Sequence, residues 1–126
     1  MQAREIGGCS PCCDDGAPVA VSGSNIYTAW SNATFKGDTV LFTKSNDGGK
    51  TFSKTMVISA PNTNPKIFVI NGNVSISASG NNVAVTWRTN ETGQGPYFPV
   101  IRTSSDGGNT FANITRLNIT SGGINK

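Results

Sequence analysis

The chain has 126 residues, a formal net charge of +3 and only 13% charged residues. This low charge excludes coiled coils and charge-rich disorder, and without a block of Lys or Arg we expect no nucleic-acid partner. No apolar run approaches the roughly 18 residues of a membrane span. Asn, Ser and Thr number 14, 13 and 14, a mix that favours turns and exposed strand faces over helices. The expectation is one soluble, all-β domain.

Residues 1–17 form a cysteine-containing N-terminal segment with Cys9, Cys12 and Cys13. A structural zinc site needs four Cys or His ligands, whereas the chain has three thiols and no histidine. We therefore predict no metal site, and a local disulfide of Cys9 with Cys12 or with Cys13 that requires an oxidising compartment. The remaining thiol is either free or paired with a cysteine outside this sequence.

Residues 18–61 are expected to form a first unit of four short strands, each bounded by Gly, Asn or Asp turn residues. The strands are predicted at 18–22, 25–30, 39–44 and 54–59. Their residues are largely β-branched or aromatic, and no stretch shows an apolar stripe at helical spacing. Four such neighbouring strands predict one antiparallel sheet.

Residues 62–126 are expected to form a second unit that repeats the first. Its copied strands are predicted at 74–78, 82–88, 98–103 and 114–119. Residues 66–70 are expected to form an inserted strand that leads into Asn71-Gly72, a strong hairpin signal. The repeat offset grows from 57 to 59 residues after Trp87, so the loop there is expected to be longer than the one after Trp30.

One eight-residue segment carries the repeat most clearly. Residues 45–52 recur as residues 104–111 with six of eight positions identical. We predict a structural turn in which the aspartate accepts backbone N–H bonds, the Gly pair takes positive φ and the hydroxyls tie the flanks together. The final aromatic ring is expected to be buried beneath the loop. The predicted structural residues are Ser45, Asp47, Gly48, Gly49, Thr51, Phe52, Ser104, Asp106, Gly107, Gly108, Thr110 and Phe111.

The two Ser-x-Asp-Gly-Gly-x-Thr-Phe segments, each between the third and fourth strands of its unit, resemble the Asp-box (BNR) repeat of sialidase-like β-propellers. The strand ending at Trp87 and the cysteine segment at residues 9–13 also resemble parts of such proteins. The resemblance covers about residues 9–120. It implies two four-stranded antiparallel propeller-type blades whose boxes are structural turns away from the central site.

Sialidases of this family hold a carboxylate with three arginines and use a Tyr–Glu pair and an aspartate. The Arg-Ile-Pro segment that marks the first of these arginines is absent here, and Tyr27 lies in an expected strand and is predicted to be a core residue. We therefore assign no catalytic residue and no cofactor. The composition alone permits a sialidase-type site, because the chain contains the arginines, tyrosines and glutamates that such a site uses: Arg4, Arg88, Arg102, Arg116, Tyr27, Tyr97, Glu5 and Glu91.

Two blades are fewer than the four to eight that typically close a propeller. Open sheet faces are therefore expected, with Trp30 and Trp87 partly exposed. The expected partners are further propeller blades or copies of the chain, and glycans or surface proteins. We expect a non-catalytic module for protein or glycan binding or for self-assembly. The alternatives are a sialidase-like glycoside hydrolase fragment completed by other blades, and a structural filament subunit.

Five Asn-x-Ser/Thr sequons are candidates for glycosylation. They begin at Asn32, Asn73, Asn90, Asn113 and Asn118. Together with sparse lysine and clustered cysteines, they favour an extracellular or cell-surface location. Asp38 and the Asp14-Asp15-Gly16 segment offer hard oxygen ligands, but without EF-hand spacing we expect solvated loop residues and no calcium site.

Overall fold

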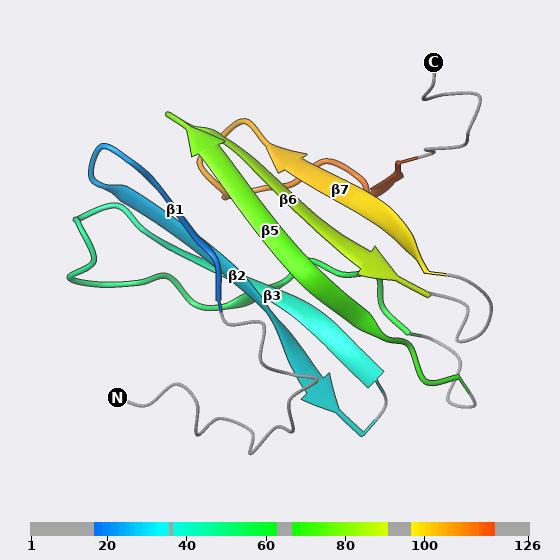
Figure 1. The fold of residues 1–126 in the computed structure, drawn as a ribbon. Helices are drawn as coiled ribbons and strands as arrows, with labels where there is room; N and C mark the ends of the chain where they lie inside the picture. The colour runs from blue at the N-terminus through cyan, green and yellow to red at the C-terminus, as the bar shows by residue number, and fades with distance from the viewer. Residues whose placement is uncertain (1–16, 36, 63–66, 91–96, 118–126) are drawn as a thin grey trace.

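The computed structural model describes residues 17–35, 37–62, 67–90 and 97–117. These residues form two four-stranded antiparallel sheets and contain no helix, which confirms the all-β prediction (Figure 1). The first sheet consists of β1 (Val19–Ser22), β2 (Asn25–Thr34), β3 (Gly37–Ser45) and β4 (Met56–Val57). The second consists of β5 (Asn71–Ser79), β6 (Asn82–Thr89), β7 (Phe98–Ser104) and β8 (Thr115–Arg116).

Each sheet is a meander in which strands that follow one another in sequence lie side by side. The hairpins β1–β2 and β5–β6 turn at Gly23 and Gly80, whose φ angles of 64° and 61° suit glycine. Between β2 and β3 the turn spans residues 35–36, whereas residues 90–97 separate β6 from β7. The prediction of a longer loop after Trp87 is therefore confirmed.

The inserted strand and the Asn-Gly hairpin were predicted wrongly. Of the described residues 67–70, Val69 alone makes a β-bridge, to Gly37 of the first sheet, and Asn71-Gly72 is the start of β5. The Asn71 side-chain Nδ2 donates to the Asp38 carbonyl at 2.7 Å, so a contact between the sheets holds this residue in extended chain. Positive φ occurs instead at Asn73, within an irregularity of the β5–β6 pairing.

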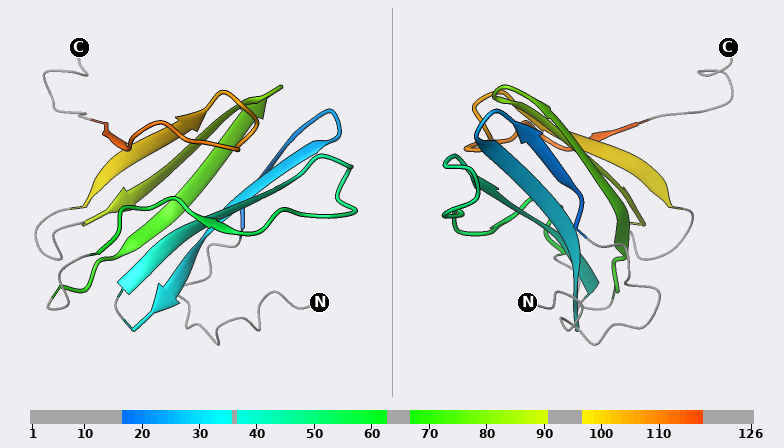
Figure 2. Two further views of the ribbon diagram at one scale, coloured as in Figure 1. Left: turned by 180° about the vertical axis from the view of Figure 1, so that it is seen from behind. Right: turned by 60° about the vertical axis from the view of Figure 1, so that its left-hand side comes forward.

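The two sheets pack face to face as two layers (Figure 2). The core between them is fully buried, and each large apolar side chain in it contributes about 1.5–3 kcal/mol of burial free energy. Tyr27 belongs to this core, as predicted, and its hydroxyl donates to the Gly80 carbonyl across the interface at 3.0 Å. The core residues are Tyr27, Ala29, Val40, Phe42, Ile58, Val83, Val85, Trp87 and Val100.

The two tryptophans occupy the same repeat position but have different surroundings. Trp87 lies on the inner face of the second sheet and is 2% exposed, so the prediction that it is partly exposed was wrong. Trp30 is partly exposed, as predicted, on the outer face of the first sheet. The difference arises because the second sheet buries the face that the first sheet turns outward.

Candidate functional site

The two eight-residue segments form nearly identical loops, which we name Asp loop 1 (residues 45–52) and Asp loop 2 (residues 104–111). In Asp loop 1, the Ser45 hydroxyl donates to Asp47 Oδ1 at 2.7 Å and accepts the Gly49 N–H at 2.9 Å. Thr51 donates its N–H to Asp47 Oδ1 at 3.0 Å and its hydroxyl to Oδ2 at 2.6 Å. One serine and one aspartate thus close the turn.

Asp loop 2 repeats each of these bonds. The Ser104 hydroxyl donates to Asp106 Oδ1 at 2.7 Å and accepts the Gly108 N–H at 2.8 Å. Thr110 donates its N–H and hydroxyl to the two Asp106 oxygens at 2.9 and 2.6 Å. Both glycines of the loop have positive φ, as they do in Asp loop 1. The predicted turn geometry is therefore present twice.

The hydrogen bonds also keep both loop aspartates ionised. The Thr51 hydroxyl, followed by the Thr51 N–H and the Ser45 hydroxyl, lowers the pKa of Asp47 from 3.8 to about 2. The equivalent bonds from Thr110 and then Ser104 lower the pKa of Asp106 as well. A carboxylate with a lowered pKa and occupied oxygens is a poor general base near neutral pH. This chemistry supports a structural role for both loops.

Each Asp loop is also fixed to the first hairpin of its own sheet. The Gly48 N–H donates to the Ser24 carbonyl at 2.9 Å, and the Gly107 N–H donates to the Asn81 carbonyl at 2.8 Å. The loop therefore joins the end of the third strand to the turn between the first and second strands. This connection holds the loop against the hairpin through a backbone hydrogen bond.

The aromatic residues at the ends of the loops differ, contrary to the prediction that both rings are buried. Phe52 is 50% exposed. Phe111 is partly buried, with its ring 4.9 Å from that of Phe42 in an edge-to-face arrangement. Phe111 has this partner because Asp loop 2 lies against the first sheet, whereas none of the described residues provides an equivalent surface for Phe52.

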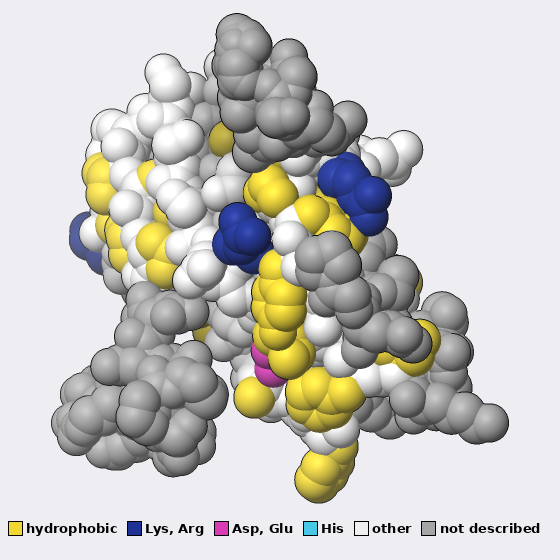
Figure 3. All heavy atoms as spheres, turned by 45° about the vertical axis from the view of Figure 1, so that its right-hand side comes forward, with side chains coloured by type: hydrophobic (Ala, Val, Ile, Leu, Met, Phe, Trp, Pro, Cys, Tyr) yellow, Lys and Arg dark blue, Asp and Glu magenta, His cyan; other side chains and the backbone are white. Residues whose placement is uncertain are grey.

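The described arginines do not converge on one site. Arg102 donates to the carbonyls of Ile58 and Ala112 at 3.0 and 2.7 Å, and Arg116 lies 3.6 Å above the Phe98 ring. Arg88 is exposed. Charged side chains on the face drawn in Figure 3 are likewise scattered. No arginine clamp for a carboxylate exists among the described residues, while Arg4, Glu5 and Glu91 lie outside them.

The other predicted positions are distributed as follows. Asn73 and Asn113 are exposed, and Asn32 is half-buried. Asn90 is 6% exposed and its Oδ1 accepts the Ile70 N–H at 2.7 Å, so this side chain is occupied in the fold. Burial raises the pKa of Asp38, and no group of three or more metal-ligating residues occurs in the described ranges. The cysteines, Asp14, Asp15 and Asn118 lie outside those ranges.

The outer face of the first sheet is the most distinctive exposed surface. It carries Trp30 and Leu41 at the repeat positions where the second sheet has the buried Trp87 and Val100. Beside them lie three valines that are each more than half exposed: Val19, Val21 and Val57. We name this surface the valine face; it comprises Val19, Val21, Ile26, Trp30, Leu41 and Val57.

The outer face of the second sheet has the opposite character. Its strands β5 and β6 present mainly small and hydroxyl-bearing side chains to solvent. They are Ser75, Ser77, Ser79, Ala84 and Thr86. Sequence reasoning missed this contrast, although the alternation of valine in residues 19–21 and of serine in residues 75–79 is a period-2 signal that indicates it.

Comparison with known proteins adds no relative to this picture. No protein-family model matches the sequence, and a search of curated proteins gives no match. Within the described part of the chain, no helix is long and apolar enough to span a membrane.

Proposed function

We propose that the chain is a non-catalytic module of two β-propeller-type blades that assembles with a further blade through the valine face. The observation that carries this proposal is that equivalent apolar positions of the two sheets are buried in the second sheet and exposed in the first. The first sheet turns outward the same repeat positions that the second sheet buries. A surface of this kind favours a partner similar to the inner face of the first sheet.

The packing already present in the molecule indicates the geometry of this assembly. The outward residues Trp30 and Leu41 correspond to Trp87 and Val100, which pack against the inner face of the first sheet. If an added blade packs on the first sheet as the first sheet packs on the second, its inner face covers the valine face. Neighbouring blades of a propeller are arranged in this way. The added blade belongs either to a second copy of the chain or to a longer polypeptide.

Several features support the non-catalytic part of the proposal. The Asp loops resemble Asp-box turns, their carboxylates are held by local hydrogen bonds, and Arg102 is engaged with backbone carbonyls. The exposed sequon residues Asn73 and Asn113 support an extracellular or cell-surface location.

The test is the solution mass of the chain, measured by light scattering after size exclusion over a range of concentrations. We expect concentration-dependent association that Val21→Lys abolishes, because the charge would be buried in the interface. Val21 is 61% exposed, so the substitution leaves the isolated fold intact. The matched control is Ser77→Lys on the outer face of the second sheet, which should associate like the parent chain.

A chain that stays monomeric at every concentration and binds no hydrophobic dye would contradict the proposal. Equal loss of association in the Val21→Lys and Ser77→Lys variants would also contradict it, because the valine face would then not be the contact surface.

A further inference from the structure

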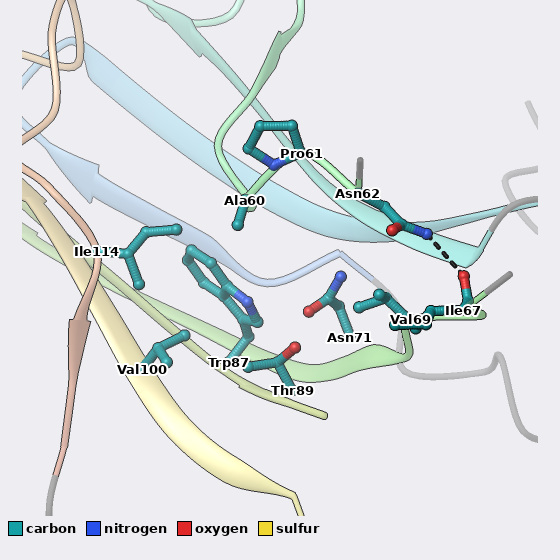
Figure 4. Close-up of a pocket in the computed structure, with 10 residues that line it drawn as sticks. All are labelled: Ala60, Pro61, Asn62, Ile67, Val69, Asn71, Trp87, Thr89, Val100 and Ile114. Atoms are coloured by element: carbon teal, nitrogen blue, oxygen red, sulfur yellow. Dashed lines mark hydrogen bonds between the residues drawn. The ribbon is translucent and has the colours of Figure 1, made fainter. Parts of the chain in front are cut away.

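A pocket of about 230 Å³ lies between the inner face of the second sheet and the segment that follows β4 (Figure 4). The second sheet and its flanks contribute Asn71, Trp87, Thr89 and Val100 to its lining. Residues 60–62 form the opposite wall and are exposed, so the pocket is reached from solvent on that side. Its volume is below the roughly 300–1,000 Å³ of sites for drug-sized ligands, which suits a single small ring.

Two polar groups in this pocket have no hydrogen-bond partner among the described residues. Trp87 and Thr89 are 2% and 3% exposed, yet among the described residues nothing accepts from the Trp87 indole N–H or bonds the Thr89 hydroxyl. Fully enclosed side-chain nitrogens and oxygens in the described ranges all have hydrogen-bond partners. These two atoms are therefore accessible to solvent, and the pocket is the space that both residues line.

Asn71 adds a third group whose orientation is fixed. Its Nδ2 donates to the Asp38 carbonyl at 2.7 Å, and an oxygen in that place would face another oxygen. Its Oδ1 is therefore the atom left to accept a hydrogen bond from a ligand. In Figure 4 the Asn71 oxygen, the Thr89 hydroxyl and the Trp87 indole nitrogen face the same part of the pocket.

The chemistry of the lining defines the ligand. It offers one N–H donor, one carbonyl acceptor and one hydroxyl that does either, while none of the described residues lining it is charged. Asn62 also lines the pocket, with its Nδ2 donating to the Ile67 carbonyl at 2.8 Å. The remaining walls are apolar, formed by residues such as Pro61, Val100 and Ile114. A neutral sugar ring matches this arrangement because it has apolar C–H faces and hydroxyls along its edge. An acidic sugar does not match, since none of the described residues lining the pocket carries a positive charge.

We infer that this pocket binds one neutral hexose unit through Trp87, Thr89 and Asn71. The site lies on the inner side of the second sheet, so the inference does not depend on what covers the valine face. Sugar binding in this pocket would be a second function beside the proposed assembly through the valine face, and it requires no catalytic residue. Unpaired donors and acceptors in a nearly buried site are costly unless a ligand or ordered water satisfies them.

The experiment follows the side-chain indole signals of the ¹⁵N-labelled chain by NMR while a sugar is added. The chain has two tryptophans, and Trp30→Phe identifies the Trp87 signal. The probes are D-galactose, D-glucose and N-acetyl-D-glucosamine, with N-acetylneuraminic acid as the charged comparison. We expect a saturable shift of the Trp87 signal with at least one neutral sugar and none with the acid.

Thr89→Val tests the hydroxyl directly. Valine keeps the shape of threonine and removes an unpartnered group, so the variant should fold at least as stably as the parent chain. We expect the dissociation constant of the sugar to rise about three- to tenfold, as for the loss of one hydrogen bond. Thr86→Val, on the same strand but on the outer face, is the matched control and should bind normally.

The inference is overturned if no neutral sugar shifts the Trp87 signal, which would mean that the pocket holds ordered water only. It is also overturned if Thr89→Val binds the sugar as tightly as Thr86→Val does. Lactose separates two sources of the ligand: binding as tight as galactose supports the end of a glycan chain, whereas weaker binding supports a free monosaccharide.

Discussion

Replacing Gly108 by alanine tests how closely Asp loop 2 packs on the first sheet. A Cβ at Gly108 would lie 2.6 Å from Cζ and 2.7 Å from Cε2 of Phe42, which is closer than real Cβ atoms approach. Phe42 is buried between Tyr27, with ring centroids 6.3 Å apart, and Phe111 at 4.9 Å. The ring has packed neighbours on both sides, so the added methyl group must strain the core.

Gly49 is the matched position in Asp loop 1. Its φ of 95° resembles the 86° of Gly108, so alanine carries a similar backbone strain at both sites, about 1–2 kcal/mol. The nearest atom to a Cβ at Gly49 is the flexible end of Ile26, at 3.3 Å. Overpacking of a well-packed core adds about 1–3 kcal/mol at Gly108 only.

We therefore expect Gly49→Ala to lower the free energy of unfolding by about 1–2 kcal/mol and Gly108→Ala by about 2–5 kcal/mol. Urea unfolding followed by tryptophan fluorescence, at concentrations where the chain is monomeric, measures both. The denaturant dependence should be unchanged, so that the midpoints report stability. Equal losses in the two variants would refute the packing of Asp loop 2 against Phe42.

Three further outcomes follow from the hydrogen bonds across the fold. The hydrogen bonds in the two Asp loops lower the pKa of both Asp47 and Asp106, so the stability that these carboxylates contribute is present above pH 3.8. The contribution of Asp47 is lost as the pH falls through about 2, and that of Asp106 is lost at still lower pH. Acid unfolding measured by circular dichroism should show this loss, and replacing both residues by asparagine should remove it. Tyr27→Phe should cost about 0.5–1.5 kcal/mol in urea unfolding, because the bond to the Gly80 carbonyl is lost. Arg102→Met should cost about 1–2 kcal/mol in thermal unfolding, since it leaves three backbone carbonyls without their charged donor.

Controls for these variants lie elsewhere on the surface. Tyr97→Phe and Arg88→Met alter exposed side chains, so each should stay within about 0.5 kcal/mol of the parent chain. If Tyr97→Phe lowers stability as much as Tyr27→Phe does, the contact of Tyr27 with Gly80 is not what holds the sheets together. If Arg102→Met leaves thermal stability unchanged, its carbonyl contacts contribute nothing to the fold.

The sequence by itself determined the features that depend on neighbouring residues. The eight short strands follow from β-branched runs bounded by turn residues, and all are present, although β4 and β8 have two residues each. The Ser-x-Asp-Gly-Gly-x-Thr segment specifies its own turn, because the bonds of its serine and aspartate side chains join residues at most four positions apart. The repeat also predicted that the second sheet would be built like the first.

Only the tertiary structure decided which face of each sheet is buried. Both sheets carry tryptophan at the same repeat position, and packing one sheet on the other encloses Trp87 while leaving Trp30 outward. Asn71 is a second example of a feature that the local sequence does not determine. Its turn propensity is overridden by a hydrogen bond to Asp38, a residue 33 positions away. The polar groups that face the pocket are likewise brought together by the packing. These outcomes depend on contacts between the two sheets, so they cannot be predicted from the local sequence pattern of either unit.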